Sequence, residues 1–252
     1  MSGTPLTDAI NALTTYSNTV TGASDTTLSD AVATLASGYG GGGSDNLPAL
    51  AMGTVVDSEV DWSSITKLRT NAFYDCTALQ TVGNPTIPQL PSGGFRGCTA
   101  LKNVEITASN VTQTYCGNIF RGCTNLETAT IHFTYTGNND VDFGETYAFS
   151  GDSKLHTVIL ERNHATKSIG LRANWMFENC TLLRNLVLKT SVMVTLTNGV
   201  NANAWGGLWN NPTDSKIFVP QALISQYQQA NNWSTLYSHG ISFVAIEGSI
   251  YE

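Results

Sequence analysis

Apolar residues recur in a fixed order through the middle of the chain. A phenylalanine is followed by a cysteine three residues later, a leucine six residues later, and further apolar residues at nine and eleven. The first three positions suit one face of a short helical or 3₁₀ turn, whereas the last two alternate as in a β-strand. The pattern predicts a unit in which a tight turn leads into a short strand.

This unit is repeated along the chain, as "FRGCTALKNVEI" and "FRGCTNLETATI" illustrate. Successive copies lie 22 to 29 residues apart, which indicates a fixed turn with loops of variable length. One unit cannot bury its own apolar side, but stacked units share a continuous core and a parallel strand ladder. The copies begin at Phe73, Phe95, Phe120, Phe149 and Phe177, with a degenerate sixth at Trp209. The predicted core positions are Phe73, Cys76, Leu79, Phe95, Cys98, Leu101, Phe120, Cys123, Leu126, Phe149, Leu155, Phe177, Cys180 and Leu183.

The cysteines of the repeat favour packing over disulfide formation, because the same residue type at the same motif position suits a small buried side chain. A set of disulfides is the alternative. In the fourth copy Asp152 replaces the cysteine, and we expect its side chain to accept a hydrogen bond from nearby backbone N–H groups. Cys116 lies outside the motif, which does not account for it.

Two longer repeats contain a second alternating segment. Residues 130–143 alternate, break at "TGNND" and resume, and residues 186–196 behave in the same way. Both segments predict a strand, a turn and a returning strand. The coil should therefore have strands on two sides where the repeats are long.

The sequence after the repeats predicts a cap. Pro220 should open a helix that runs to about Ala230, with Leu223 and Tyr227 on its inner face. Alternation at Ile241, Phe243 and Ala245 then predicts a closing strand. Such a cap covers the final edge of a repeat array.

The N-terminal region has a different pattern. Residues 1–37 predict two short helices with narrow apolar stripes, and the glycine-rich residues 38–46 predict a flexible tether. Helices this short need a partner to be stable, so we expect an anchor or oligomerisation segment. The stripe residues are Leu6, Ile10, Leu13, Leu28, Val32 and Leu35.

The blocks "NAFYDCTALQTV" and "YAFSGDSKLHTVIL", with "TIPQLP" after the first, resemble the BspA-like leucine-rich repeat family. The resemblance extends over residues 58 to 246 and implies an α/β solenoid over residues 47–216 with a C-terminal cap over 217–252. The short helical N-terminal segment would precede it. The stretch "TTLSDAVATLASGYGGG" resembles a segment of minor structural proteins of phages and prophages of Gram-positive bacteria.

Charge and hydropathy exclude several classes of function. Charged residues make up 12% of the chain, the net charge is −7, and no run of lysine or arginine is present to match a phosphate backbone. No apolar run reaches the roughly 18 residues of a membrane span, and "MSGTPLTDAI" lacks the basic start of a secretory signal. We expect no nucleic-acid partner and no membrane insertion.

Few residues offer catalytic or metal chemistry. No nucleophile elbow, zinc-protease motif or phosphate loop is present, so we expect a non-enzymatic protein without a cofactor or a metal. His132 and His156 fall in adjacent repeats, either as solvent-facing strand residues or as a ligand pair. Asp140 and Asp142 flank a turn, which they either cap or turn into a calcium site.

The outward residues of stacked strands form one continuous face, so binding is the better hypothesis. Outward strand positions and aromatic loops give the candidates Lys102, Asn103, Glu105, Glu127, Thr128, Thr130, His156, Arg184, Asn185, Trp205 and Trp209. We expect a structural phage or prophage protein, a fibre, spike or decoration component of the virion, that displays the repeats to a host-surface glycan or protein. Its N-terminus would contact other virion proteins, and a homotrimer is the first expectation for its assembly. The alternative is an adhesin of the bacterial cell surface or extracellular space.

Overall fold

The structure of the protein is a computed structural model that describes residues 55–65, 67–110, 116–144, 146–197 and 200–252. The expected helical anchor, with Leu6, Ile10, Leu13, Leu28, Val32 and Leu35, lies outside the described residues, as does the glycine-rich tether.

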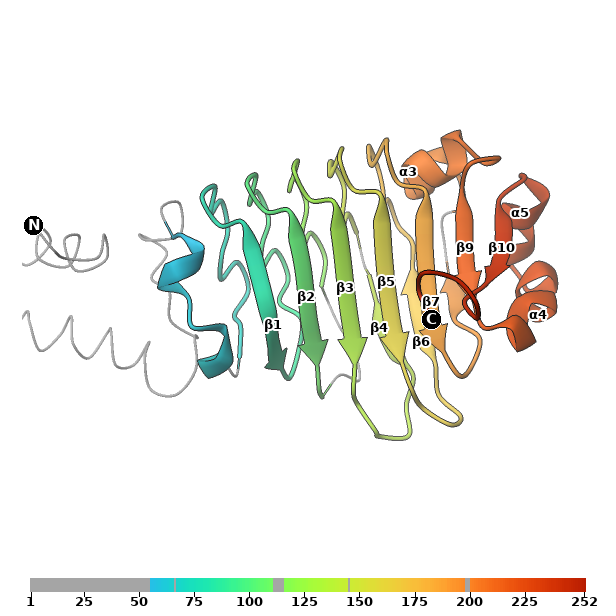
Figure 1. Ribbon diagram of the computed structural model, residues 1–252, viewed down its shortest axis with the longest axis horizontal. Helices are drawn as coiled ribbons and strands as arrows, with labels where there is room; N and C mark the ends of the chain where they lie inside the picture. The colour runs from blue at the N-terminus through green and yellow to red at the C-terminus, as the bar shows by residue number, and fades with distance from the viewer. Residues whose placement is uncertain (1–54, 66, 111–115, 145, 198–199) are drawn as a thin grey trace, which may run out of the picture.

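Seven strands of the described residues form one parallel sheet, sheet A, in the order β1-β2-β3-β5-β7-β9-β10. Each repeat contributes one strand, so neighbours in sequence are neighbours in space, and the strands run side by side across Figure 1. The strands are β1 (Thr81–Ile87), β2 (Asn103–Ala108), β3 (Thr128–Phe133), β5 (Thr157–Arg162), β7 (Asn185–Thr190), β9 (Lys216–Val219) and β10 (Ser242–Ala245).

A second parallel sheet, sheet B, lies on another side of the coil. It contains β4 (Val141–Phe143), β6 (Ile169–Arg172) and β8 (Thr195–Thr197), which pair in that order. The prediction of strands on two sides in the longer repeats is confirmed. The strands of sheet B do not reverse onto sheet A as hairpins, because each pairs with the equivalent strand of the next coil.

The repeated phenylalanines form a single file of stacked rings through the core. Ring centroids of Phe73, Phe95, Phe120, Phe149 and Phe177 are successively 5.2, 5.6, 5.3 and 5.6 Å apart, and the rings are nearly parallel. All fourteen predicted core positions are fully buried. The periodic apolar pattern thus describes one shared core rather than separate ones.

Trp205, and not Trp209, continues this file. Its ring lies 5.8 Å from that of Phe177, and the Phe177 N–H donates to Ala204 O as the Phe149 N–H donates to Met176 O. The sixth copy therefore begins four residues earlier than the sequence suggested. The turn of this copy is wound into helix α3 (Ala202–Asn210), which is capped by the Asn201 side chain and kinked at a glycine. Figure 1 shows α3 at the edge of sheet A where the strands begin.

The motif cysteines connect one coil to the previous one. The thiols of Cys98, Cys123 and Cys180 each donate to the carbonyl oxygen of the phenylalanine one repeat earlier, at 2.9 to 3.0 Å. All five cysteines are buried and none forms a disulfide. Cys116, which the motif did not explain, accepts a hydrogen bond from the Gly144 N–H at 3.3 Å.

Short helices close the C-terminal end of the stack, where Figure 1 places α4 and α5 next to β10. These helices are η3 (Gln221–Leu223), α4 (Ile224–Gln229) and α5 (Trp233–Ser238). At the other end of the stack, two 3₁₀ helices, η1 (Asp57–Glu59) and η2 (Trp62–Ser64), precede β1. Pro220 precedes η3 and the helical segment ends before Ala230, as expected. Tyr227 is buried, and its hydroxyl accepts the Val194 N–H at 2.8 Å.

Candidate functional site

The outward face of sheet A changes character along the stack. The third residue points outward in each of β2, β3, β5, β7 and β9, and the register aligns Glu105, Thr130, Ile159, Val187 and Phe218 on these strands. At this position the face is polar over β2 and β3 and apolar over β5, β7 and β9, whereas two residues further on the register aligns the polar residues Thr107, His132, Glu161 and Lys189. A parallel sheet is usually covered on both faces, so the apolar half needs a cover.

Residues 246–252 provide that cover. Ile246 packs on Val187 and Phe218, and the ring of Tyr251 meets the ring of Phe218 edge-on at 4.7 Å. Val187, although outward, is fully buried by this contact. Figure 1 shows the C-terminal segment, in dark red, crossing in front of β7. The open surface of sheet A is consequently its polar half, which consists of β1, β2, β3 and the part of β5 that carries Glu161.

A carboxylate–imidazole–carboxylate row crosses the polar half. His132 Nε2 lies 3.0 Å from Glu105 Oε1 on β2, and His132 Nδ1 lies 3.1 Å from Glu161 Oε2 on β5. Ionised carboxylates only accept hydrogen bonds, so both contacts form together only when the imidazole carries two protons. The row continues onto β1, where Asn84 Nδ2 donates to Glu105 Oε1 at 3.1 Å.

These side chains surround a hollow of about 430 Å³ on the sheet. Glu105 and Glu161 remain substantially exposed, with side-chain exposures of 53% and 40%, whereas His132 is 24% exposed. The lining residues are Asn84, Glu105, Thr107, His132, Phe133, Thr134, Glu161 and Asn163. The hollow offers carboxylate and amide groups beside a mostly buried imidazole and the buried Phe133, an arrangement suited to binding a group that carries hydrogen-bond donors.

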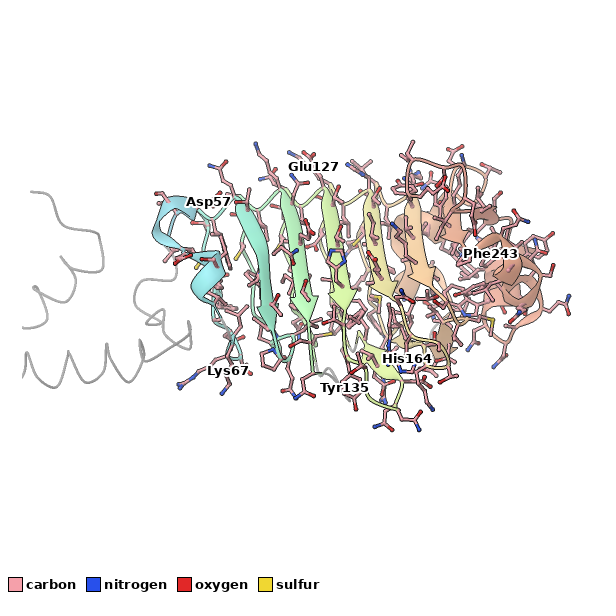
Figure 2. The ribbon with its side chains drawn as sticks, turned by 60° about the horizontal axis from the view of Figure 1, so that its bottom comes forward. Asp57, Lys67, Glu127, Tyr135, His164 and Phe243 are labelled. Atoms are coloured by element: carbon pink, nitrogen blue, oxygen red, sulfur yellow. The ribbon has the colours of Figure 1, made fainter. Side chains whose placement is uncertain are left out.

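Nine of the eleven predicted binding residues fall into two groups, one on sheet A and one at its edge. Asn103, Glu105, Thr128, Thr130 and Asn185 lie at outward strand positions of sheet A. The residues just before the strands lie at the edge where the strands begin, as Figure 2 shows for Glu127. This edge group is Lys102, Glu127, His156 and Arg184. Only Glu105 of the predicted set lines the hollow.

The two tryptophans proposed for binding do not contribute to this surface. The prediction for Trp205 is wrong, because its ring is fully buried between Phe177 and Trp233 in the core file. Trp209 is half-buried, and its ring stacks on His239 with 3.7 Å between centroids. Both tryptophans of this Asn/Gly-rich segment therefore pack within the last coil.

The sequence pointed to His132 and to its partner Glu105, but not to its second partner Glu161 or to Asn84, which donates to Glu105. Glu161 and Asn84 come from other repeats, 29 and 48 residues away in the chain, and only the strand register brings them to His132 and Glu105. The signal was available in the repeat alignment, since all these residues follow their strand start by an even number of positions or border a bulge. His156 is not part of the row and contacts Thr157 Oγ1 at 3.1 Å.

The acidic turn of the third repeat has a structural role. Asp140 Oδ1 accepts the Ser168 N–H at 2.8 Å, and Asp142 Oδ2 accepts from Arg172 Nη2 at 2.6 Å. These carboxylates connect successive coils. Within the described residues, no group of three or more histidine, cysteine or acidic side chains is arranged to hold a metal ion.

The buried ionisable groups also lie in the core rather than in the hollow. Burial raises the pKa of the Asp152 carboxyl well above its ordinary value, although its Oδ1 accepts the Cys123 N–H at 2.8 Å. Burial likewise raises the pKa of the Cys123 and Cys180 thiols, with the nearby Asp152 adding to the effect. Burial raises the pKa of Tyr227 to about 12. None of these groups reaches a surface where it can act on a ligand.

The stacked coils and their strand face define a repeat fold built on parallel strands. Residues 58–144 match the family model described as "BspA type Leucine rich repeat region (6 copies)". The turn-and-strand unit continues with the same geometry beyond the matched residues, through Phe149 and Phe177. No curated protein and no solved structure matches the chain.

Repeats of this type suggest a module for protein interaction or adhesion. Among the described residues, no helix combines the length and hydropathy that spanning a bilayer requires.

Proposed function

We propose that the protein is a non-enzymatic adhesion module that binds a protein partner through the polar half of sheet A. The carrying observation is the row Glu105–His132–Glu161, which joins three adjacent strands above the hollow. The two ionised carboxylates of the row make the hollow negatively charged. When the imidazole between them is protonated, the row still carries one excess negative charge. A lysine or arginine side chain of the partner suits this charge.

Rigidity of the scaffold supports the proposal. Each residue of the row stands on a strand that is hydrogen-bonded into the same sheet, so the groups keep their spacing without a ligand. Preorganised polar groups lose little conformational entropy when a partner binds. The cover formed by residues 246–252 also leaves one half of the face open, which limits the contact surface to β1, β2, β3 and β5.

As the setting of this module we propose a phage or prophage particle, with the N-terminal segment attached to other virion proteins and the protein assembled as a homotrimer. A bacterial cell-surface adhesin is the second setting that we propose. Mass spectrometry of purified particles and of the cell-wall fraction from the source distinguishes the two settings. Presence of the protein in the particles supports the first setting, and its presence only in the cell-wall fraction supports the second. The mass of the full-length protein by light scattering tests the homotrimer.

Binding to intact host bacteria tests the function itself. Fluorescently labelled full-length protein should bind the cells saturably, and the double variant Glu105→Gln/Glu161→Gln should lose at least tenfold in apparent affinity while keeping its unfolding midpoint. Tyr237→Ala, an exposed aromatic of the cap, is the matched surface control and should bind as the wild type does. Equal binding by the glutamine variant, or no saturable binding by the wild type, would show that the hollow is not the contact surface.

A further inference from the structure

The turns that precede the strands form a second ordered surface, the turn face. In the first four repeats the residue two before the motif phenylalanine donates its N–H to a carbonyl of the next repeat, for example Asn118 N to Thr146 O at 3.0 Å. The same pattern holds for Tyr147 N to Asn174 O at 3.1 Å. The turns are therefore stacked in register, as the strands are, and equivalent side chains follow one another along a row.

All residues in this row have a left-handed backbone. The φ angles are 59° at Asn71, 61° at Gly93, 59° at Asn118, 65° at Tyr147 and 58° at Trp175. Glycine and asparagine occupy this region readily, so the first three repeats carry the expected residues. Tyrosine and tryptophan do so at a cost in free energy, because Cβ approaches the following carbonyl oxygen.

Core packing does not offset that cost. Trp175 is 44% exposed and Tyr147 is half-buried, in contrast to the fully buried phenylalanines two residues further on. The two rings touch edge to face, with centroids 5.5 Å apart and planes at 64°. Bulky residues held in an unfavourable backbone conformation and left at the surface point to function.

A cation and polar groups complete the aromatic pair. The Arg121 guanidinium lies over the Tyr147 ring, 4.6 Å from its centroid, and its Nη1 donates to Asn118 Oδ1 at 3.2 Å. On the next coil the Glu178 carboxylate accepts a hydrogen bond from Ser150 Oγ at 3.0 Å and is partly exposed. The strip formed by Arg121, Tyr147 and Trp175 thus offers ring faces flanked by donors and acceptors.

The geometry points to a carbohydrate-binding site on this strip, which we infer to hold a sugar ring of a cell-surface glycan. A pyranose has an apolar C–H face that packs on an exposed indole and hydroxyl groups at its rim that bond to guanidinium and carboxylate groups. Trp175 is 44% exposed, so the strip suits one or two residues of a longer chain better than a fully enclosed ligand. The site lies on the turns rather than on sheet A and does not depend on the function proposed above.

The asparagine found in earlier repeats provides a sharp test. In the full-length protein, Tyr147→Asn and Trp175→Asn restore the residue that favours the left-handed region, so both variants should unfold at a higher urea concentration than the wild type. Both should also lose at least tenfold in affinity for glycan. Binding is measured on a printed array of bacterial cell-wall and mammalian oligosaccharides, and then by calorimetry with the tightest array ligand.

A gain in stability together with a loss of glycan affinity supports the inference, because a merely structural aromatic pair would lose stability when it is removed. Tyr237→Ala is the control for an unrelated exposed aromatic residue and should change neither glycan binding nor the urea midpoint of the repeat region. No glycan bound by the wild type, or unchanged affinity in Trp175→Asn, would overturn the inference. The glutamine variants of sheet A should bind glycan as the wild type does, which keeps the two surfaces distinguishable.

Discussion

Replacing Asp152 with cysteine should stabilise the protein. Asp152 occupies the motif position that is cysteine in the neighbouring repeats, and it is fully buried. Its Oδ1 accepts the Cys123 N–H at 2.8 Å, but its Oδ2 is buried with no hydrogen-bond partner. A buried unsatisfied polar atom costs about 1–3 kcal/mol.

The variant loses little in exchange. The Cys123 N–H also donates to Phe120 O at 3.0 Å, so it keeps a partner when the carboxylate is removed. The lost hydrogen bond to the carboxylate contributes about 1 kcal/mol net. The new thiol should donate to the Phe120 carbonyl oxygen, because the thiols of Cys123 and Cys180 each donate to the phenylalanine carbonyl one repeat earlier. We therefore expect Asp152→Cys to raise the free energy of unfolding by about 1–2 kcal/mol at neutral pH.

The stability difference between the variant and the wild type should depend on pH. Burial raises the pKa of Asp152 in the folded protein, so above the ordinary aspartate pKa of about 4 the unfolded chain releases this proton before the folded one does. The unfolded state then binds fewer protons, and the contribution of Asp152 to stability falls as pH rises from there towards its folded pKa. The advantage of the cysteine variant should therefore be smallest at about pH 4 and grow at higher pH.

Urea unfolding at pH 4 and pH 7, followed by tryptophan fluorescence under reducing conditions, measures this difference. Asp152→Asn serves as a second neutral variant that retains the acceptor oxygen, and its advantage over the wild type should also increase with pH. An Asp152→Cys protein that is less stable than the wild type at pH 7, or whose advantage does not change with pH, would refute the reasoning.

Two further substitutions test the core and the turn of the last coil, again by urea unfolding. Phe120→Ala should lower the free energy of unfolding by about 4 kcal/mol, because the ring is stacked between two others with centroids at 5.6 and 5.3 Å. Phe120→Leu should lower it by less than half as much. Equal losses of stability in the two variants would argue against the stacked file. Gly206→Ala should cost well over 1 kcal/mol, because φ is 46° and a Cβ would approach Phe177 O to 2.1 Å. Gly122→Ala has φ of 78° but no atom within 4 Å of its Cβ, so it reports the backbone cost alone, and an equal loss there would exclude the clash as the cause.

The core was predictable because its signal is local and repeated. Phenylalanine, cysteine and leucine at fixed spacing identify the same inner positions in every copy, and the structure places all of them in one cluster. The substitution at Asp152 was also readable, since a polar residue at an inner position must find a backbone partner. The copy at Trp209 was misplaced because the fit of "WNNPTDSKIFV" to the motif depended on one aromatic residue, and Trp205 four residues earlier was equally suitable.

The surface was less predictable because it depends on contacts between distant residues. Val187 lies at an outward strand position, but nothing in the local sequence shows that Ile246 and Tyr251 return to cover it. The pairing of His132 with Glu105 and Glu161 depends on register across three repeats, and a slip of one residue would move all three to the inner face. The left-handed turn positions had a readable signal in Asn71, Gly93 and Asn118, which the repeat motif did not include.

The stacking in register separates what the inner and outer positions can do. An inner residue such as Phe120 contacts the equivalent residues of two other coils, so a change there is felt along the file. An outward residue such as Glu105 or Trp175 has equivalent neighbours on its surface but little burial to lose. Changes at outward positions can therefore alter recognition at a small cost in stability. At Trp175 we expect replacement by asparagine to increase stability. For this reason a rise in stability when Trp175 becomes asparagine distinguishes a residue kept for recognition from one kept for the fold.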